Sequence, residues 1–277
     1  MADVSAERVH NVISTREMLA RDAALLTSAV REAGALALSL FRTELKNWTK
    51  GASSPVSEAD IRTNDLLESR LRSATPDYGW LSEESVDDDK RLGKRLTWIV
   101  DPIDGTRGYL AGREDWCVSV ALVEDATAVL AAVFVPVSDE FFFAVRGQGA
   151  TLNGVSVAAA TGAELDFPRV AGPKPLVERL NASTGDTVLH PRIGSLALRL
   201  CRVAHGSLDA AFAGGQSRDW DLAAANLIVQ EANGNMTALS GDTILYNRRE
   251  VTHGVLVAAG RDRHARIVEH FRNHPLP

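Results

Sequence analysis

The sequence has little cysteine and no excess of positive charge. Its two cysteines, Cys117 and Cys201, lie in apolar stretches and lack CxxC spacing. This favours free buried thiols in a reducing compartment over a disulfide. Because the formal net charge is -6, we expect no general attraction to nucleic acid polymers or to anionic membranes. An anionic ligand must therefore be bound by local positive charge, which bound cations would supply.

Segments typical of secretion or membrane insertion are also missing. The N-terminus lacks a basic region followed by an apolar one, and the longest apolar run, residues 128–137, is too short to cross a bilayer. We therefore expect a cytoplasmic protein that does not associate with membranes.

Several compact catalytic motifs are absent. No GxSxG segment or Ser-His-Asp order indicates a serine hydrolase, and neither cysteine has the setting of a nucleophile. Gly147 and Gly149 are not followed by a GxGxxG or Walker pattern, so we interpret them as turn glycines. The C-terminal histidines lack a compact zinc spacing, and we expect them at the surface. They are His253, His264, His270 and His274.

The apolar pattern predicts an ordinary globular α+β protein. A chain of 277 residues that is 45% hydrophobic can bury a substantial core, as one domain with two packed halves at about 15–153 and 154–277. A frayed tail is expected up to Ser14. The charged stretch 87–91 is expected to be a solvated loop.

Hydrophobic periodicity places the main elements. Helices are expected at about 15–41, 58–72, 195–204, 221–233 and 262–271, with Gly234 ending the fourth of these helices. Three apolar β-rich runs separated by turns predict an antiparallel meander, followed by a hairpin at Asn153-Gly154. These runs and the two later strands are expected at 117–123, 129–135, 140–145, 208–213 and 255–259.

The most informative stretch is LTWIVDPIDGT, in which a β-branched apolar run over residues 96–100 predicts a buried strand. Asp101 and Asp104 follow directly, so two carboxylates are expected on a turn at the strand end. Gly105 allows the backbone to approach a ligand closely. If a helix begins near Thr106, its free N–H groups face the same space as the aspartates. Such a site can hold a cation and an anion together, as hydrolysis of a phosphate ester requires.

DPIDGT with a following aromatic, Tyr109, closely resembles the first metal-binding motif of the inositol monophosphatase superfamily. Two further segments match in the same order, since WLSEES at 80–85 is similar to the family's acidic pair and WDLAAA at 220–225 to its WDxAA motif. The resemblance spans roughly residues 20–260. It implies the layered αβαβα sandwich of that superfamily, with the active site between two halves.

The resemblance also implies a site rich in carboxylates. Glu83, Asp101, Asp104 and Asp221 converging on one pocket would repel one another unless cations neutralised them. Ligands that are all oxygen suit Mg²⁺, with Mn²⁺ able to substitute, and argue against zinc. By analogy, the first ion takes Glu83, Asp101 and the Ile103 carbonyl, and the second takes Asp101, Asp104 and Asp221.

Two further residues have both a functional and an ordinary interpretation. Asp60 occupies the position where family members carry an aspartate near a third, weaker metal. Its other interpretation, compatible with the first, is an acid that stabilises a helix N-terminus. Lys50 resembles a loop lysine that helps to organise the metal site, or it is simply solvated.

The resemblance assigns catalytic roles as well. Glu83 would polarise the attacking water, Glu84 would support Glu83, and Thr106 paired with Glu83 would orient the water. Gly194 and Ser195 would present N–H and hydroxyl groups to the substrate, unless the serine is only a helix N-cap. The expected substrate contacts are Asp104, Gly105, Thr106, Gly194, Ser195, Arg218 and Asp221.

The expected substrate depends on the positions where this sequence differs from the inositol phosphatases. Their glutamate that contacts the inositol ring has no counterpart in GGQSR at 214–218, where Arg218 would suit a second phosphate. YNRR at 246–249 and HGVLVA at 253–258 look similar to bacterial bisphosphate nucleotidases. The resemblance therefore ranks adenosine 3',5'-bisphosphate first, inositol monophosphate or another sugar phosphate second and histidinol phosphate third. Inhibition by lithium and a homodimer are expected from the family alone.

The alternative from another class is a metal-bound scaffold that recognises a protein or RNA partner. Loss of a ligand acid would be its mark in the sequence, and all the acids are present. We therefore expect a small phosphorylated substrate rather than a nucleic acid polymer.

Overall fold

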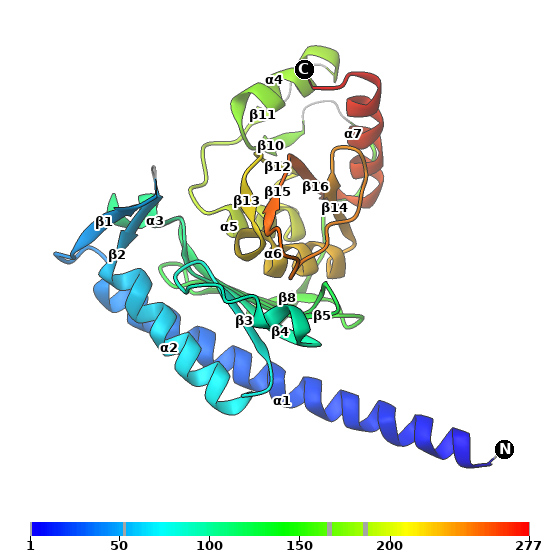
Figure 1. The fold of residues 1–277 in the computed structure, drawn as a ribbon. Helices are drawn as coiled ribbons and strands as arrows, with labels where there is room; N and C mark the ends of the chain where they lie inside the picture. The colour runs from blue at the N-terminus through cyan, green and yellow to red at the C-terminus, as the bar shows by residue number, and fades with distance from the viewer. Residues whose placement is uncertain (1, 52–53, 165–167, 185–187, 277) are drawn as a thin grey trace.

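The computed structural model describes residues 2–51, 54–164, 168–184 and 188–276. Five layers are stacked on one another, alternating helices and sheets (Figure 1). This arrangement confirms the predicted αβαβα sandwich. The helical layers are α1 (Ala2–Leu40) with α2 (Glu58–Ala74), then α5 (Leu196–Ala204) with α6 (Asp219–Glu231), then α4 (Lys174–Thr184) with α7 (Arg261–Asn273).

The larger sheet has seven strands, ordered β3-β4-β5-β6-β7-β8-β9. β3 and β4 are parallel and the other neighbours are antiparallel, so the predicted meander and hairpin are confirmed. The strands are β3 (Gly79–Ser82), β4 (Leu96–Asp104), β5 (Cys117–Glu124), β6 (Thr127–Val135), β7 (Glu140–Val145), β8 (Ala150–Leu152) and β9 (Val155–Val157).

The smaller sheet is mixed and has the order β11-β10-β12-β16-β14. Its strands are β11 (Val188–Leu189), β10 (Arg169–Ala171), β12 (Ala210–Ala213), β16 (Leu256–Gly260) and β14 (Gly234–Ala238). Two short ribbons and two short helices complete the described structure. They are β1 (Asn47–Lys50) with β2 (Ser54–Ser57), β13 (Ser217–Arg218) with β15 (Thr252–His253), α3 (Thr106–Leu110) and the 3-10 helix η1 (Lys90–Gly93).

Alternate residues of the central strands enter different cores. Trp98 and Val100 of β4 pack with the helices α1 and α2. Ile99 packs on the opposite face with residues of α5 and α6. Because helices cover both faces, every residue of β4 is buried, and this explains why the strand reads as a continuous apolar run.

Helix α1 is longer than the sequence pattern indicates. It begins at Ala2, so the prediction of a frayed tail to Ser14 is wrong for the described residues. Its segment Glu17–Leu40 has the length and apolar content to cross a bilayer. However, Leu26 and Val30 are fully buried against the large sheet, as in the core helix of a globular protein.

The ends of α6 also differ from the prediction. The helix begins at Asp219 because the Asp221 carboxylate accepts a hydrogen bond from the backbone N–H of Arg218, which caps it. It ends before Asn233, whose φ of 61° takes the left-handed conformation that Gly234 was expected to supply. Gly234 instead begins β14, where a Cβ atom would contact Val229.

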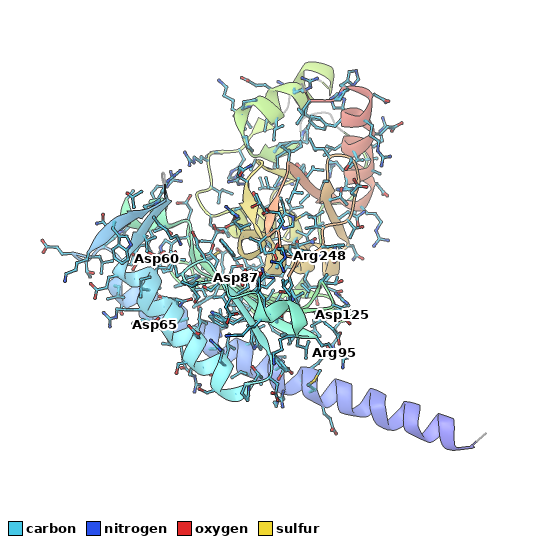
Figure 2. All side chains as sticks on the ribbon, in the orientation of Figure 1. Asp60, Asp65, Asp87, Arg95, Asp125 and Arg248 are labelled. Atoms are coloured by element: carbon cyan, nitrogen blue, oxygen red, sulfur yellow. The ribbon has the colours of Figure 1, made fainter. Side chains whose placement is uncertain are left out.

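Two predicted surface features are buried. Arg91, expected in a solvated loop, is only 1% exposed. It binds the Asp87 carboxylate and the Arg248 carbonyl, two residues that lie near each other between the halves (Figure 2). His264 is buried rather than at the surface because α7 packs its side chain against β14, within 3.0 Å of the Thr237 hydroxyl.

Candidate active site

Asp101 and Asp104 lie on a bulged strand end rather than on a turn after the strand. β4 continues its pairing with β5 as far as Asp104 opposite Cys117, and the register shifts between the two aspartates. Within the bulge, Asp101 Oδ1 accepts a hydrogen bond of 3.1 Å from the Ile103 N–H. A bulge re-aims the side chains of the strand that carries it, so both carboxylates face the same space.

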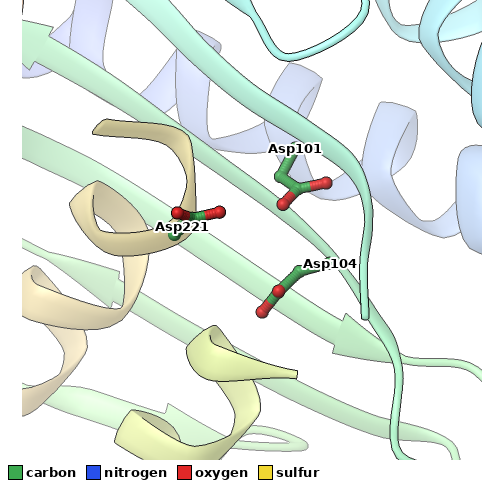
Figure 3. Close-up of side chains that lie close together, drawn as sticks. All are labelled: Asp101, Asp104 and Asp221. Atoms are coloured by element: carbon green, nitrogen blue, oxygen red, sulfur yellow. The ribbon is translucent and has the colours of Figure 1, made fainter. Parts of the chain in front are cut away.

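Asp221 reaches the same space from the first turn of α6. One carboxylate oxygen from each of Asp101, Asp104 and Asp221 lies within 4.8 Å of the others. Figure 3 shows the three side chains pointing toward one another from β4 and α6. The convergence predicted from sequence is therefore present for these three acids.

Burial and mutual repulsion raise the pKa values of the acids in this cleft. Burial raises the pKa of Asp101 well above its ordinary value, and the charges of Glu83 and Asp104 raise it further. The pKa of Asp221 is raised by burial and then by Asp104. Burial raises the pKa of Glu83 to about 7, against the opposing effect of Lys50. Such a set of carboxylates is stable in its ionised form when a divalent cation shares it.

The donor set fits Mg²⁺ or Mn²⁺. Carboxylate oxygens are hard ligands, and this cluster contains no sulfur or imidazole donor among the described residues. Glu83 and the Ile103 residue line the same cleft as the three aspartates. These are the residues that would hold the ions.

Lys50 contacts the acidic pair directly. It lies at the end of β1, and its Nζ donates to the Glu83 carbonyl and to Glu84 Oε1, each at 2.8 Å. The same ammonium group lies 3.7 Å from Glu83 Oε1. Lys50 is thus a strand residue that holds both glutamates in place, not a solvated loop lysine.

Thr106 pairs with Asp60, and the prediction that it pairs with Glu83 is wrong. The Thr106 hydroxyl lies 3.0 Å from Asp60 Oδ1 and 3.1 Å from the Ile103 carbonyl. The other Asp60 oxygen accepts hydrogen bonds from the N–H and hydroxyl of Ser57, at 2.8 and 2.6 Å, in a capping box. The pairing arises because the start of α2 packs beside the DPIDGT segment. A metal role for Asp60 stays a prediction.

Ser195 orients Asp104. Its hydroxyl donates to Asp104 Oδ2 at 2.6 Å and accepts from the Leu198 N–H at 2.9 Å. The Ala197 N–H also donates to Asp104 Oδ2, at 2.6 Å. The N-cap interpretation of Ser195 is therefore confirmed, and its hydroxyl also donates to one of the clustered carboxylates. The N–H of Gly194 donates to the Asp115 carboxylate.

These groups surround one cleft of about 500 Å³. Its wall contains most of the predicted site residues, namely Glu83, Asp101, Ile103, Asp104, Gly105, Thr106, Gly194 and Asp221. Asp60 and Ser195 lie behind this wall, where they hold Thr106 and Asp104.

The predicted contact of Arg218 with substrate is not seen in the geometry. Its exposed side chain donates to the Thr252 hydroxyl at 2.6 Å, and it is not among the residues that line the cleft. Its backbone N–H holds Asp221 instead.

Three arginines on the cleft wall were missed by the sequence analysis. They are Arg107, Arg113 and Arg192. The signal for them was their position, because two closely follow the DPIDGT motif and the third lies two residues before Gly194.

Comparisons with known proteins agree with this site. Residues 18–276 match the model of the inositol monophosphatase family. Nus factor SuhB of Xylella fastidiosa is 34% identical over 228 residues, which cover 78% of this chain and 82% of that protein. Inositol-1-monophosphatase of Caulobacter vibrioides is 32% identical over 244 residues, which cover 83% of this chain and 92% of that protein.

Solved structures give the same result for the fold. The crystal structure of extragenic suppressor protein suhB from Bartonella henselae has a TM-score of 0.78 at 26% identity, covering 90% of this chain and 97% of that chain. An IMPase/NADP phosphatase complexed with Mg²⁺ and phosphate is similar in fold, with a TM-score of 0.80 at 22% identity over 92% of this chain and 96% of that chain. The motifs, the clustered acids and these matches together place the chain in the inositol monophosphatase family.

Proposed function

We propose that this protein is a Mg²⁺-dependent phosphomonoesterase that uses two or three ions, with Mn²⁺ able to substitute. The observation that carries the proposal is the convergence of Asp101, Asp104 and Asp221 in one cleft. Membership of the family supports it, since a homologue is named for phosphatase activity on inositol 1-phosphate. The two buried free cysteines support a reducing, cytoplasmic setting.

The residues of the cleft have two roles in the proposed reaction, which are to bind the metal ions and to orient the attacking water. Mg²⁺ held by Glu83, Asp101, Asp104 and Asp221 would supply Lewis acidity for activating water and neutralising phosphate charge. Thr106 donates its hydroxyl proton to Asp60, so its oxygen is available to accept a hydrogen bond from the attacking water. That contact would orient the water toward phosphorus.

The remaining groups bind the phosphate or keep the acids in place. Gly105 and Thr106 line the cleft, and their N–H groups would bind phosphate oxygens as negative charge is redistributed. Ser195 and the Ala197 N–H keep Asp104 oriented and favour its ionised form. Attack of water on phosphorus would release the alcohol and inorganic phosphate without a covalent enzyme intermediate.

For the substrate, we propose adenosine 3',5'-bisphosphate, which would yield AMP and phosphate. Residues 214–218 contain no acid, and three arginines line the cleft. Both observations favour an ester whose alcohol part is itself anionic over an ester of a neutral polyol. Inositol 1-phosphate is the second candidate, favoured by the name of the Caulobacter relative. Histidinol phosphate is the third.

The test is a comparison of these three esters with the full chain at saturating Mg²⁺. Phosphate release is measured for each ester, with EDTA-treated protein as the control for metal dependence. We expect the highest kcat/KM for adenosine 3',5'-bisphosphate and inhibition by lithium. The nucleotidase proposal fails if this ester is the poorest of the three.

A second role follows from the names of other relatives. Several are called Nus factor SuhB, including the proteins of Xylella fastidiosa and Escherichia coli. As a second candidate we propose an assembly role beside catalysis, with recognition of a protein or RNA partner. Metal-dependent phosphate release from any small phosphomonoester would rule against a purely structural role.

A further inference from the structure

Three arginines line the active-site cleft, and together they are called the arginine wall. Arg107 belongs to the first turn of α3, Arg113 follows that helix, and Arg192 precedes the start of α5. All three line the same cleft as Asp101 and Asp221. The cleft therefore combines a carboxylate cluster with a cationic wall.

Arg113 is held at the cleft by a fixed set of contacts. Its Nε and Nη2 donate to the two Asp115 carboxylate oxygens, at 2.9 and 2.5 Å, and Nη2 also donates to the Arg192 carbonyl at 3.0 Å. Asp115 in turn accepts the Gly194 N–H, and its carbonyl accepts the Ser195 N–H at 3.0 Å. This network joins the segment after α3 to the backbone that carries Arg192, so the Arg113 guanidinium and the Arg192 backbone are held together at the cleft.

The charge of Arg192 is not balanced by a neighbouring acid. Its side chain is exposed, and the described residues offer it no carboxylate partner. The nearby positive charge of Arg192, after the larger effect of burial, lowers the pKa of Arg199. Arg192 thus adds positive charge to a region that already holds one guanidinium.

The charge of Arg192 stays available to a ligand once metal is bound. Two divalent ions would balance the four carboxylates Glu83, Asp101, Asp104 and Asp221. Asp115 neutralises Arg113, so Arg192 would then face the ligand with the charge that no carboxylate among the described residues balances. Guanidinium groups bind phosphate and carboxylate well because their donors match two oxygens at once.

We infer that the arginine wall, with Arg192 as its main ligand, is a second anion subsite that binds a phosphate or carboxylate of the substrate other than the scissile phosphate. The inference rests on the proposed phosphatase function and deepens it. It predicts that the preferred substrates are phosphomonoesters that carry a second anionic group. The cleft, at about 500 Å³, lies within the size range of sites for small ligands.

The test uses two pairs of esters that differ in the second anion. 2-Phosphoglycerate replaces one hydroxymethyl group of glycerol 2-phosphate by a carboxylate, and adenosine 3',5'-bisphosphate adds a phosphate to adenosine 3'-phosphate. For the wild-type protein with Mg²⁺, we expect kcat/KM to favour the doubly anionic member of each pair by at least about tenfold, the scale of one charge-assisted hydrogen bond.

Substitutions of the arginines then show which residues cause the preference for the doubly anionic ester. Arg192→Gln, alone and combined with Arg107→Gln, should bring both ratios toward one, mainly through KM. Arg95→Gln is the control, since this exposed arginine pairs with Glu124 away from the cleft and should keep the wild-type ratios. Circular dichroism and the thermal midpoint establish that each variant is folded.

The outcomes separate this inference from the proposed function. Turnover of both members of each pair at equal kcat/KM, or a preference that survives in the double variant, overturns the subsite while leaving the phosphatase intact. Absence of turnover overturns the phosphatase proposal. Calorimetric binding of the same esters in Mg²⁺ then decides the subsite, which stands only if the doubly anionic ester binds more tightly and Arg192→Gln removes the difference.

Discussion

Asp101 is buried among other acids at the end of β4, and its side chain faces both Asp104 and Asp221. We predict that Asp101→Asn lowers turnover by at least about a hundredfold, the scale for losing a strong electrostatic contact in a transition state. Because the amide removes one of several repelling charges, the metal-free variant should also unfold at a higher temperature than metal-free wild type.

Phosphate release and thermal unfolding in EDTA measure these two effects. Asp65→Asn on the exposed side of α2 is the control and should change neither. Wild-type turnover of Asp101→Asn at saturating Mg²⁺ would refute the site.

His264 links stability to pH. Burial lowers its pKa to about 4 from the ordinary value of 6.5. Between these two pH values, the imidazole is protonated in the unfolded chain but not in the folded protein. Stability should therefore fall as pH decreases from 6.5 to 4, by up to about 3 kcal/mol for this group. His264→Gln should flatten the dependence of the unfolding free energy on pH over that interval.

Urea unfolding at several pH values measures the slope. His205→Gln, at an exposed position, is the matched control and should retain the wild-type slope. An unchanged slope in His264→Gln would contradict the assignment.

At the scale of elements, Gly34 determines how closely α1 approaches the large sheet. A Cβ atom there would lie 2.3 Å from the Phe134 ring of β6, far inside contact distance. We predict that Gly34→Ala destabilises the protein by about 1–3 kcal/mol, as overpacking does, although alanine is the better helix former.

The free energy of unfolding in urea provides the measurement. Gly93→Ala, where a Cβ would meet nothing within 4 Å, is the control and should be nearly neutral. A stabilised Gly34→Ala variant would mean that α1 can move away from β6 without loss.

Elements were predictable where one local signal dominated. The helix expected over 58–72 is present as α2 with its Ser57 cap, and the three strands of the meander fall within one or two residues of their expected bounds. The predicted ends of elements were wrong where the same local sequence is compatible with more than one backbone conformation. Asn233 replaced Gly234 as the left-handed residue, because both asparagine and glycine accept positive φ.

For the whole molecule, the proposed metal ligands come from opposite halves of the sandwich. Asp101 and Asp104 lie on the large sheet, whereas Asp221 belongs to α6 in the second half. An ion bound by these three acids would therefore stabilise the packing of the two halves as well as the ionised carboxylates. We predict that Mg²⁺ raises the thermal midpoint, with a stabilisation of about 2.7 kcal/mol when its concentration is a hundredfold above the dissociation constant.

Differential scanning calorimetry with Mg²⁺ and with EDTA measures the shift. The shift should shrink strongly in Asp221→Asn, whereas Asp65→Asn should behave as wild type. An equal shift in wild type and Asp221→Asn would show that the stabilising ion binds elsewhere.

By itself, the sequence determined the chemical character of this protein. DPIDGT, the acidic pair and the WD motif are short segments whose residue types specify oxygen ligands and close approach of the backbone, and these follow from local chemistry. The apolar periodicity likewise specified which faces are buried, because a strand or helix shows its period in any fold.

Only the tertiary structure decided which side chains meet across the layers. It paired Thr106 with Asp60 instead of Glu83, and it buried Arg91 between Asp87 and the 246–249 segment. It also brought Arg113 and Arg192 to one wall of the cleft. These contacts depend on the packing of segments distant along the chain, and no local pattern in the sequence encodes the register at which two layers meet.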